Sequence, residues 1–183
     1  MKTNVKNYTS QQLLDWVKSL QSFKTIPVGY WSIMVRSTED SVNEFDDKFY
    51  LFKGEEFISV SSCTTNKGLN GTAVIQSNNW NYDSHRFGLH RGKMEALRQV
   101  KGINYYRDTN KDGKTDETGK IFNDIIFTNI HGATYNKGSK QVSTKVGGWS
   151  EGCIVLNDND YYENFISLVK NQSYFSFVII REF

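Results

Sequence analysis

The chain has 183 residues, with 22 Lys and Arg against 20 Asp and Glu, and its formal net charge is +2. This length suits one domain with a sizeable core, and the near balance of charge lacks the basic excess that is typical of nucleic-acid-binding proteins. We therefore expect a monomer that binds no nucleic acid, with a flexible N-terminus over residues 1–9 and a single domain over residues 10–183.

Long apolar runs are missing from the sequence. No stretch approaches the roughly 18 apolar residues that a membrane-spanning helix needs, and residues 1–9 lack the apolar centre of a signal peptide. We expect no transmembrane segment. Two cysteines are too few for a disulfide framework, which fits synthesis in a reducing compartment.

The first predicted element is an amphipathic helix that Ser10 would cap, because apolar residues recur with helical spacing from Leu13 to Leu20. Strand-like runs follow over residues 28–36, 48–53, 56–64 and 72–76, separated by clusters of Asp, Asn, Gly and Lys. The first half of the chain therefore indicates a mainly β protein.

Further along, the spacing of Met94, Leu97 and Val100 predicts a short helix that ends near Gly102. The run 124–130 predicts a strand, and a second short helix is expected after the capping candidates Asn157 and Asp158. Residues 174–181 form the last predicted strand. The expected fold class is mainly β, with a few short helices that include the N-terminal one.

One pair of motifs points to chemistry. His131-Gly132 follows a predicted strand, and Ser150-Glu151-Gly152-Cys153 leads into the apolar run 154–156. A free thiol has a pKa of about 8.5, so an imidazole that accepts its proton makes the sulfur a better nucleophile. Glycines beside the sulfur let the backbone come close to a substrate, and the amides of Gly152 and Cys153 could face an oxyanion.

The order His-Gly, a gap, then Ser-x-Gly-Cys resembles the catalytic domain of the L,D-transpeptidase (YkuD-like) family. The gap lies at the long end of the family's range. Glu151 stands where that family usually has a second histidine, which is similar to a divergent branch of phage-type and Bacteroidetes-type relatives. The stretch 88–97 is similar to that branch as well.

The resemblance implies a YkuD-like β-sandwich or barrel and a cysteine acyltransferase. Cys153 would attack the carbonyl of the third residue of a peptidoglycan stem peptide, forming a thioester while His131 manages the protons. An amine acceptor makes the enzyme a transpeptidase, and water makes it an L,D-carboxypeptidase or endopeptidase. Such an enzyme, bacterial or phage, acts on the bacterial cell wall, which it would reach by export, lysis, a phage particle or an injection system.

Several residues are expected to support this reaction. Ser150 and Gly152 would orient the loop that carries the sulfur, and Asn129 is a candidate for fixing the imidazole of His131. The candidate substrate-binding residues are Gly132, Trp149, Glu151, Tyr135 and His90. His85 lies five residues before His90, but the sequence nearby lacks the further ligands that zinc requires. Cys63, without a neighbouring glycine, is expected to be a core thiol.

A second pattern suggests calcium. Asp108, Asn110, Asp112 and Asp116 match positions one, three, five and nine of an EF-hand loop, and a glycine stands at position six. Position twelve is Gly119, where a full loop has a bidentate carboxylate. The expectation is a weak structural calcium site at 108–117, with no cofactor required for catalysis. The alternative is a solvated Asx-rich turn.

Other classes of protein fit less well. Papain-like and NlpC/P60-like enzymes place Cys before His in the chain, and sortases have a longer gap and an Arg after the sulfur. The alternative from another class is a catalytically silent, β-rich cell-wall-binding or calcium-stabilised module, in which Glu151 marks the loss of the active site.

Overall fold

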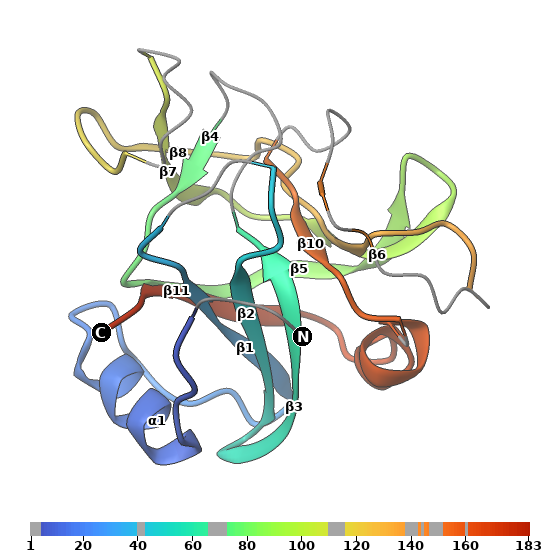
Figure 1. Cartoon of the computed structure of the whole chain (residues 1–183), viewed down its shortest axis with the longest axis horizontal. Coiled ribbons are helices and arrows are strands. Elements are labelled where there is room, and N and C mark those ends of the chain that lie inside the picture. Colours follow the sequence, from blue (N-terminus) through green and yellow to red (C-terminus); the bar gives the residue numbers. More distant parts are fainter. Residues whose placement is uncertain are drawn as a thin grey trace.

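The computed structural model describes residues 5–39, 43–65, 73–109, 116–137, 143, 145–146, 152–159 and 161–183. These residues form a closed eight-stranded barrel with a three-stranded sheet above it (Figure 1). The predicted mainly β class with short helices is confirmed. Among the described helices, none is both long and apolar enough to cross a bilayer.

The strands of the barrel follow one another round the wall in an order far from that of the sequence. They are β1 (Tyr30–Arg36), β11 (Phe175–Arg181), β5 (Asn79–His90), β6 (Met94–Gln99), β9 (Ile130–Gly132), β10 (Ile154–Leu156), β3 (Glu56–Thr64) and β2 (Asp47–Lys53). Two neighbouring pairs are parallel, β1 with β11 and β9 with β10. The small sheet contains β4 (Ala73–Ile75), β7 (Ile103–Arg107) and β8 (Phe122–Asp124).

The N-terminal helix α1 (Ser10–Ser19) is present as predicted, but its cap is Thr9 and not Ser10. Thr9 forms a capping box with Gln12, in which each residue satisfies a backbone N–H of the other. The buried face of α1 packs outside the barrel, in a cluster that includes Trp31 of β1 and Val178 of β11. Figure 1 shows the helix against this part of the wall.

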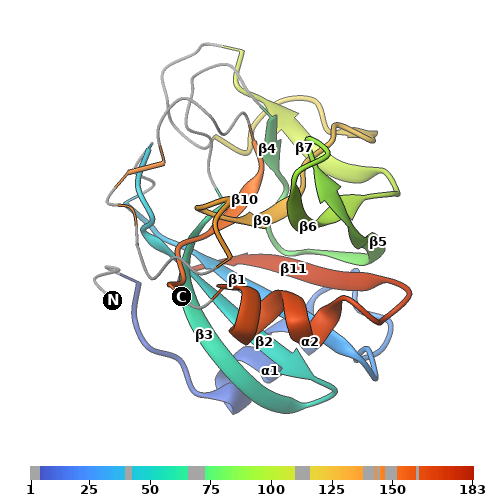
Figure 2. The same cartoon turned by 90° about the vertical axis from the view of Figure 1, so that its right-hand side faces the viewer.

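The helix predicted after Asn157 and Asp158 is also present, and it lies in front of the barrel strands in Figure 2. A π-helical turn, η1 (Tyr162–Ile166), continues into α2 (Ser167–Val169). Its buried residues join the same cluster as Met34, Phe49 and Ile130, which fills the barrel. These two helices therefore stabilise opposite faces of the β1–β11 wall.

Not every predicted element is correct. The helix expected from Met94 to Val100 is the strand β6, which pairs with residues 85–90 of β5. The strand expected over 124–130 is represented only by its ends, the last residue of β8 and the first of β9. β5 and β7 were not predicted as strands.

The described part of the predicted flexible segment 1–9 packs against the other end of the chain. Val5 is buried, and the hydroxyl of Tyr8 donates to the carbonyl of Phe183 at 2.7 Å. The rings of these two residues stack with centroids 4.5 Å apart. Residues 5–9 thus belong to the folded domain.

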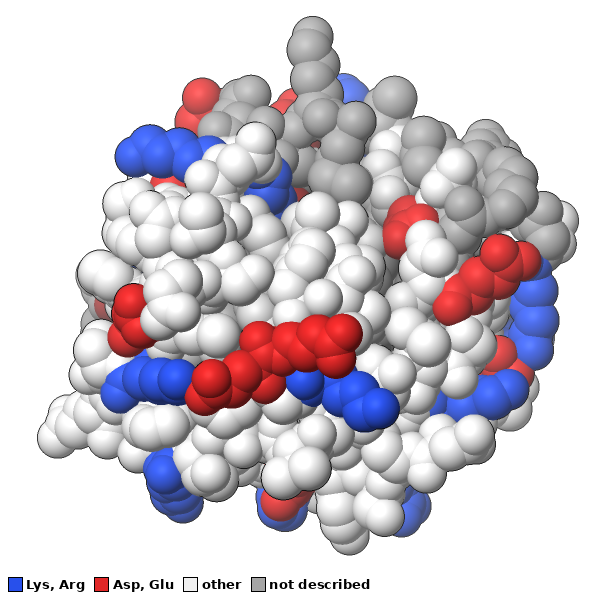
Figure 3. All heavy atoms as spheres, turned by 90° about the horizontal axis from the view of Figure 1, so that it is seen from below, with Lys and Arg blue, Asp and Glu red and all other residues white. Residues whose placement is uncertain are grey.

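Charged side chains of both signs lie close together on the face seen from below (Figure 3), with wide neutral areas between them. No broad patch of one sign covers the described part of that face, in keeping with a net charge of +2. The expectations that the chain is a monomer and binds no nucleic acid stay predictions.

Candidate active site

The register of two parallel strands brings the predicted base and nucleophile to one face of the barrel. His131 of β9 lies opposite Val155 of β10, and the amide of Ile154 donates to the carbonyl of Asn129 at 2.9 Å. Residues two apart on a strand share a face, so Asn129, His131 and Cys153 all project to the same side. Ile130 and Ile154 alternate with them and point into the core.

His90 reaches the same face from the end of the β5–β6 hairpin. It pairs with Met94, and Leu97 of β6 pairs with Ile130 of β9, which aligns the outward residues of the strands. The imidazole rings of His90 and His131 stack with centroids 4.3 Å apart and an angle of 25° between their planes.

The sulfur of Cys153 completes the cluster. One ring nitrogen each of His90 and His131 and the Sγ atom of Cys153 all lie within 4.8 Å of one another. The structure therefore brings together a thiol and two imidazoles, of which the sequence analysis paired only His131 with the sulfur.

The hydrogen-bond partner of His131 fixes where its ring carries hydrogen. Nδ1 lies 2.8 Å from the carbonyl oxygen of Gly132, which can only accept, so Nδ1 donates and Nε2 has the lone pair. The pKa of His131 is lowered to about 4, chiefly by burial, with the Gly132 bond opposing the shift and His90 and Arg91 adding to it. At neutral pH, His131 is thus a neutral base.

The prediction that Asn129 orients His131 is wrong. Asn129 instead contacts the neighbouring ring, with its Nδ2 atom 2.9 Å from Nδ1 of His90. The backbone N–H of Gln99 donates to Oδ1 of Asn129 at 3.3 Å, so the amide oxygen is already directed to a donor. Nδ2 must therefore donate to Nδ1 of His90, and the hydrogen of that ring is on Nε2.

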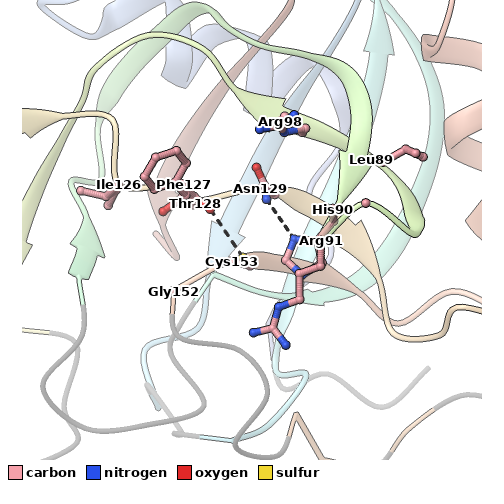
Figure 4. A pocket seen from close by; sticks show the side chains of 11 residues that line it. Leu89, His90, Arg91, Arg98, Ile126, Phe127, Thr128, Asn129, Gly152 and Cys153 are labelled. Carbon is pink, nitrogen blue, oxygen red and sulfur yellow. Dashed lines mark hydrogen bonds between the residues drawn. The ribbon is translucent and has the colours of Figure 1, made fainter.

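A cavity of about 770 Å³ opens beside the sulfur. Its walls are the hairpin end with His90 and Arg91, the side chain of Arg98, the segment 126–129, and Gly152 with Cys153. Figure 4 shows Ile126 and Phe127 on one side of Cys153 and His90 with Arg91 on the other. Cys153 is half-buried, so the sulfur is accessible from this cavity.

Phe127 is a candidate substrate contact that sequence reasoning missed. Its φ of 59° lies in the left-handed region, its side chain is 69% exposed, and its carbonyl accepts from Sγ of Cys153 at 3.9 Å. A non-glycine residue in this conformation costs energy and is more frequent at functional sites. Nothing in the sequence signals this conformation.

The two motif glycines have different positions. Gly152 lines the cavity and has a φ of 125°, a conformation that other residues rarely adopt. Gly132 was predicted to bind substrate, but it is buried and does not line the cavity. Its carbonyl oxygen accepts the hydrogen bond from Nδ1 of His131.

Several predicted site residues fall elsewhere. Trp149, Ser150 and Glu151 lie outside the described residues, so their roles stay predictions. Tyr135 is 54% exposed and is not among the described residues that line the cavity. Cys63 is fully buried in the core, and burial raises the pKa of its thiol, so its prediction as a core thiol is confirmed.

His85 is separate from this cluster. Its Nε2 atom donates to the carbonyl of Thr128 at 2.7 Å, and burial lowers its pKa to about 4. It is therefore a structural histidine.

The calcium prediction is not tested by the described residues. Asn110 and Asp112 lie outside them, Asp108 is buried and Asp116 is exposed. The carboxylate of Glu117 contacts Arg36 and Arg181 at 2.7 and 3.2 Å. That side chain thus has a structural role in the barrel.

A thiolate and two neutral imidazoles are also a ligand set that zinc accepts. Nδ1 of His90 is occupied by Asn129, so a metal would have to bind Nε2, which carries the hydrogen of the ring. Binding would require that hydrogen to move and the Asn129 contact to break. The observed hydrogen bonds therefore favour thiol chemistry at this site over metal binding.

Comparison of the chain with protein-family models finds no match, and comparisons with curated proteins and with solved structures find none either.

Proposed function

We propose that the chain is a cysteine-dependent acyltransferase of the L,D-transpeptidase kind, which acts on peptidoglycan stem peptides at the bacterial cell wall. The observation that carries this proposal is the placement of Sγ of Cys153 within 4.8 Å of a neutral imidazole, at the edge of an open cavity. The substrate class is proposed from the order of the motifs, which resembles that of the L,D-transpeptidase family.

The geometry supports a two-step reaction. As Sγ of Cys153 bonds to the carbonyl carbon of the third stem residue, Nε2 of His131 takes the thiol proton. When the carbon–nitrogen bond breaks, His131 returns that proton to the departing amine, and a thioester remains on Cys153. An incoming amine then forms a cross-link, or water releases the shortened peptide.

The surroundings of His131 keep the ring unprotonated before the attack, and a base with so low a pKa accepts the thiol proton only as the sulfur bonds to carbon. A base must be unprotonated before the thiol attacks, and the pKa of about 4 keeps His131 neutral through the physiological range. The bond from Nδ1 to Gly132 keeps the lone pair on Nε2, and it also stabilises the imidazolium that forms after proton transfer.

The test is to incubate the protein with purified muropeptides and to follow products and protein by mass spectrometry. We expect release of the terminal D-residue, or a new cross-link, together with an acyl adduct on Cys153. Cys153→Ala should abolish all three, whereas Cys63→Ala, which removes the buried thiol, should retain them. Full turnover by Cys153→Ala would refute the proposal.

The catalytically silent alternative makes a different prediction in a second measurement. A reactive Cys153 should be labelled by a low concentration of iodoacetamide before Cys63, which is inaccessible in the core. Binding to wall sacculi with no such labelling favours the silent module.

A further inference from the structure

We propose that His90 is a second catalytic residue, a neutral hydrogen-bond donor whose Nε2–H stabilises the oxyanion formed when Cys153 attacks an acyl carbon. This inference rests on the proposed acyl-transfer function and adds to it the group that receives the developing negative charge.

The two stacked imidazoles are opposite tautomers. Gly132 can only accept, so His131 has hydrogen on Nδ1, whereas the amide of Asn129 donates to Nδ1 of His90 and leaves hydrogen on Nε2. His131 therefore offers a lone pair and His90 offers an N–H. One ring is suited to accept the thiol proton and the other to donate to an oxygen.

The ring of His90 lies close to the place where the oxyanion would form. His90 lines the cavity that the sulfur faces, and no further hydrogen bond of its ring is found among the described residues beyond the Asn129 contact. An acyl group on Sγ carries its oxygen only one carbon away from the sulfur. A ring nitrogen of His90 lies within 4.8 Å of Sγ, so the acyl oxygen forms beside the His90 ring.

The charged side chains that line the described part of the cavity are positive. Arg91 and Arg98 also line the cavity, and the described lining residues include no Asp or Glu. Burial lowers the pKa of His90, and both guanidinium groups add to this shift, so the ring stays neutral at pH 7. Two guanidinium groups and a fixed neutral donor favour a negative charge that appears only during the reaction.

The step balances without proton transfer to or from His90. The S–C bond forms, the carbonyl electron pair moves to oxygen, and His131 holds the thiol proton. When the oxyanion collapses, the C–N bond breaks and the amine takes the proton from His131. Nε2–H of His90 remains bonded throughout.

The tautomers can be tested without any substrate. Long-range ¹H–¹⁵N spectra of the ¹⁵N-labelled chain at pH 7 report which nitrogen of each of the three histidines carries hydrogen. We expect Nε2–H for His90 and Nδ1–H for His131, assigned through His90→Gln and His131→Gln. Hydrogen on Nδ1 of His90 overturns the inference.

The role can be tested by comparing two reactions of Cys153. Acyl transfer from p-nitrophenyl acetate passes through an oxyanion, whereas alkylation by iodoacetamide does not. We expect His90→Ala to slow acyl transfer roughly 100-fold to 1,000-fold, as for loss of an oxyanion donor. Alkylation should stay within about twofold, and His90→Gln, which keeps an N–H near the position of Nε2, should recover part of the loss.

Equal losses in both reactions, or no loss in acyl transfer, would overturn the inference. Because neither reagent is a muropeptide, failure of the proposed substrate class remains distinguishable: it would show as p-nitrophenyl acetate turnover by the unmodified chain without turnover of stem peptides. Thermal unfolding of each variant, monitored alongside, confirms that the compared proteins are folded.

Discussion

The ring of Tyr161 lies so close to Gly132 that a β-carbon at position 132 would be 2.8 Å from the nearest ring atom. Tyr161 is fully buried in the barrel cluster, so its ring has little space to move away. The same glycine holds the base, because its carbonyl accepts from Nδ1 of His131. Packing of the core and orientation of the imidazole thus depend on one residue without a side chain.

Gly132→Ala should therefore destabilise the fold by about 1–3 kcal/mol, the usual cost of overpacking a core. The displaced carbonyl should also slow iodoacetamide labelling of Cys153. Chemical denaturation measures the first effect and labelling kinetics the second. In a Tyr161→Leu background the same substitution should cost less, and a simple sum of the two single effects would contradict the steric explanation.

Acid should destabilise the protein through its buried histidines. The pKa of both His85 and His131 is about 4 in the fold, whereas an unfolded histidine titrates near 6.5. Below pH 6.5 these two histidines bind protons in the unfolded chain, whereas in the folded chain they stay neutral until the pH approaches 4. The free energy of unfolding is therefore unaffected by these histidines above pH 6.5 and decreases as the pH falls toward 4. At pH 5 the decrease is on the order of 2 kcal/mol per histidine.

Urea unfolding at pH 7 and pH 5 measures this loss. The difference between the unmodified chain and His131→Gln isolates one histidine from other titrating groups, such as Asp47, whose pKa is raised by burial. We expect the variant to lose less stability between the two pH values. Identical losses would show that His131 does not titrate as a buried group.

The two cysteines should respond oppositely to substitution. Cys153 is half-buried at the cavity, so Cys153→Ala should leave the thermal midpoint nearly unchanged while it removes reactivity. Cys63 lies fully buried, so Cys63→Ala should lower stability by about 1 kcal/mol and keep reactivity. Calorimetry with thiol labelling checks both, and a large fall in the midpoint for Cys153→Ala would contradict a surface role.

The buried Arg36 should make Glu117 important for stability. The Arg36 side chain has no exposed area, and its Nη1 atom lies 2.7 Å from Glu117. Glu117→Ala leaves that charge with reduced compensation and should cost about 3–5 kcal/mol in denaturant unfolding. Lys18→Ala breaks an exposed ion pair with Glu55 and should cost at most about 1 kcal/mol, so similar losses would contradict the argument.

Strongly patterned segments were predictable. The strand over residues 56–64 has its predicted bounds, because β-branched and aromatic residues fill it between turn-forming ones. Met94, Leu97 and Val100 lie three apart, which fits a helical period, but pairing with β5 makes the segment a strand in which Met94 and Leu97 are buried on opposite faces. β5 itself is rich in Asn, Asp, Ser and His, so its partners rather than its composition determine its structure.

The site was predictable only in part. His131 and Cys153 have recognisable neighbours, since a glycine lies next to each and an apolar strand follows the cysteine. His90 becomes their neighbour through the pairings of β5 with β6 and of β6 with β9, which no spacing in the sequence reveals. His131 bonds to the carbonyl of Gly132, and Asn129 bonds to His90 in place of His131. Both contacts depend on ring positions that are set only when the barrel closes.

The parallel pairing of β9 with β10 has a consequence for variation among any relatives of this chain. Two parallel neighbours need a crossover connection from the end of one strand to the start of the other, and the register of the pair does not fix how long that connection is. A change of length in that connection, away from Gly152 and Cys153, should leave the hydrogen bonds between β9 and β10, and hence the approach of imidazole to sulfur, unaltered. A search for relatives should accordingly leave the interval between histidine and cysteine free and instead require the residues that flank each strand.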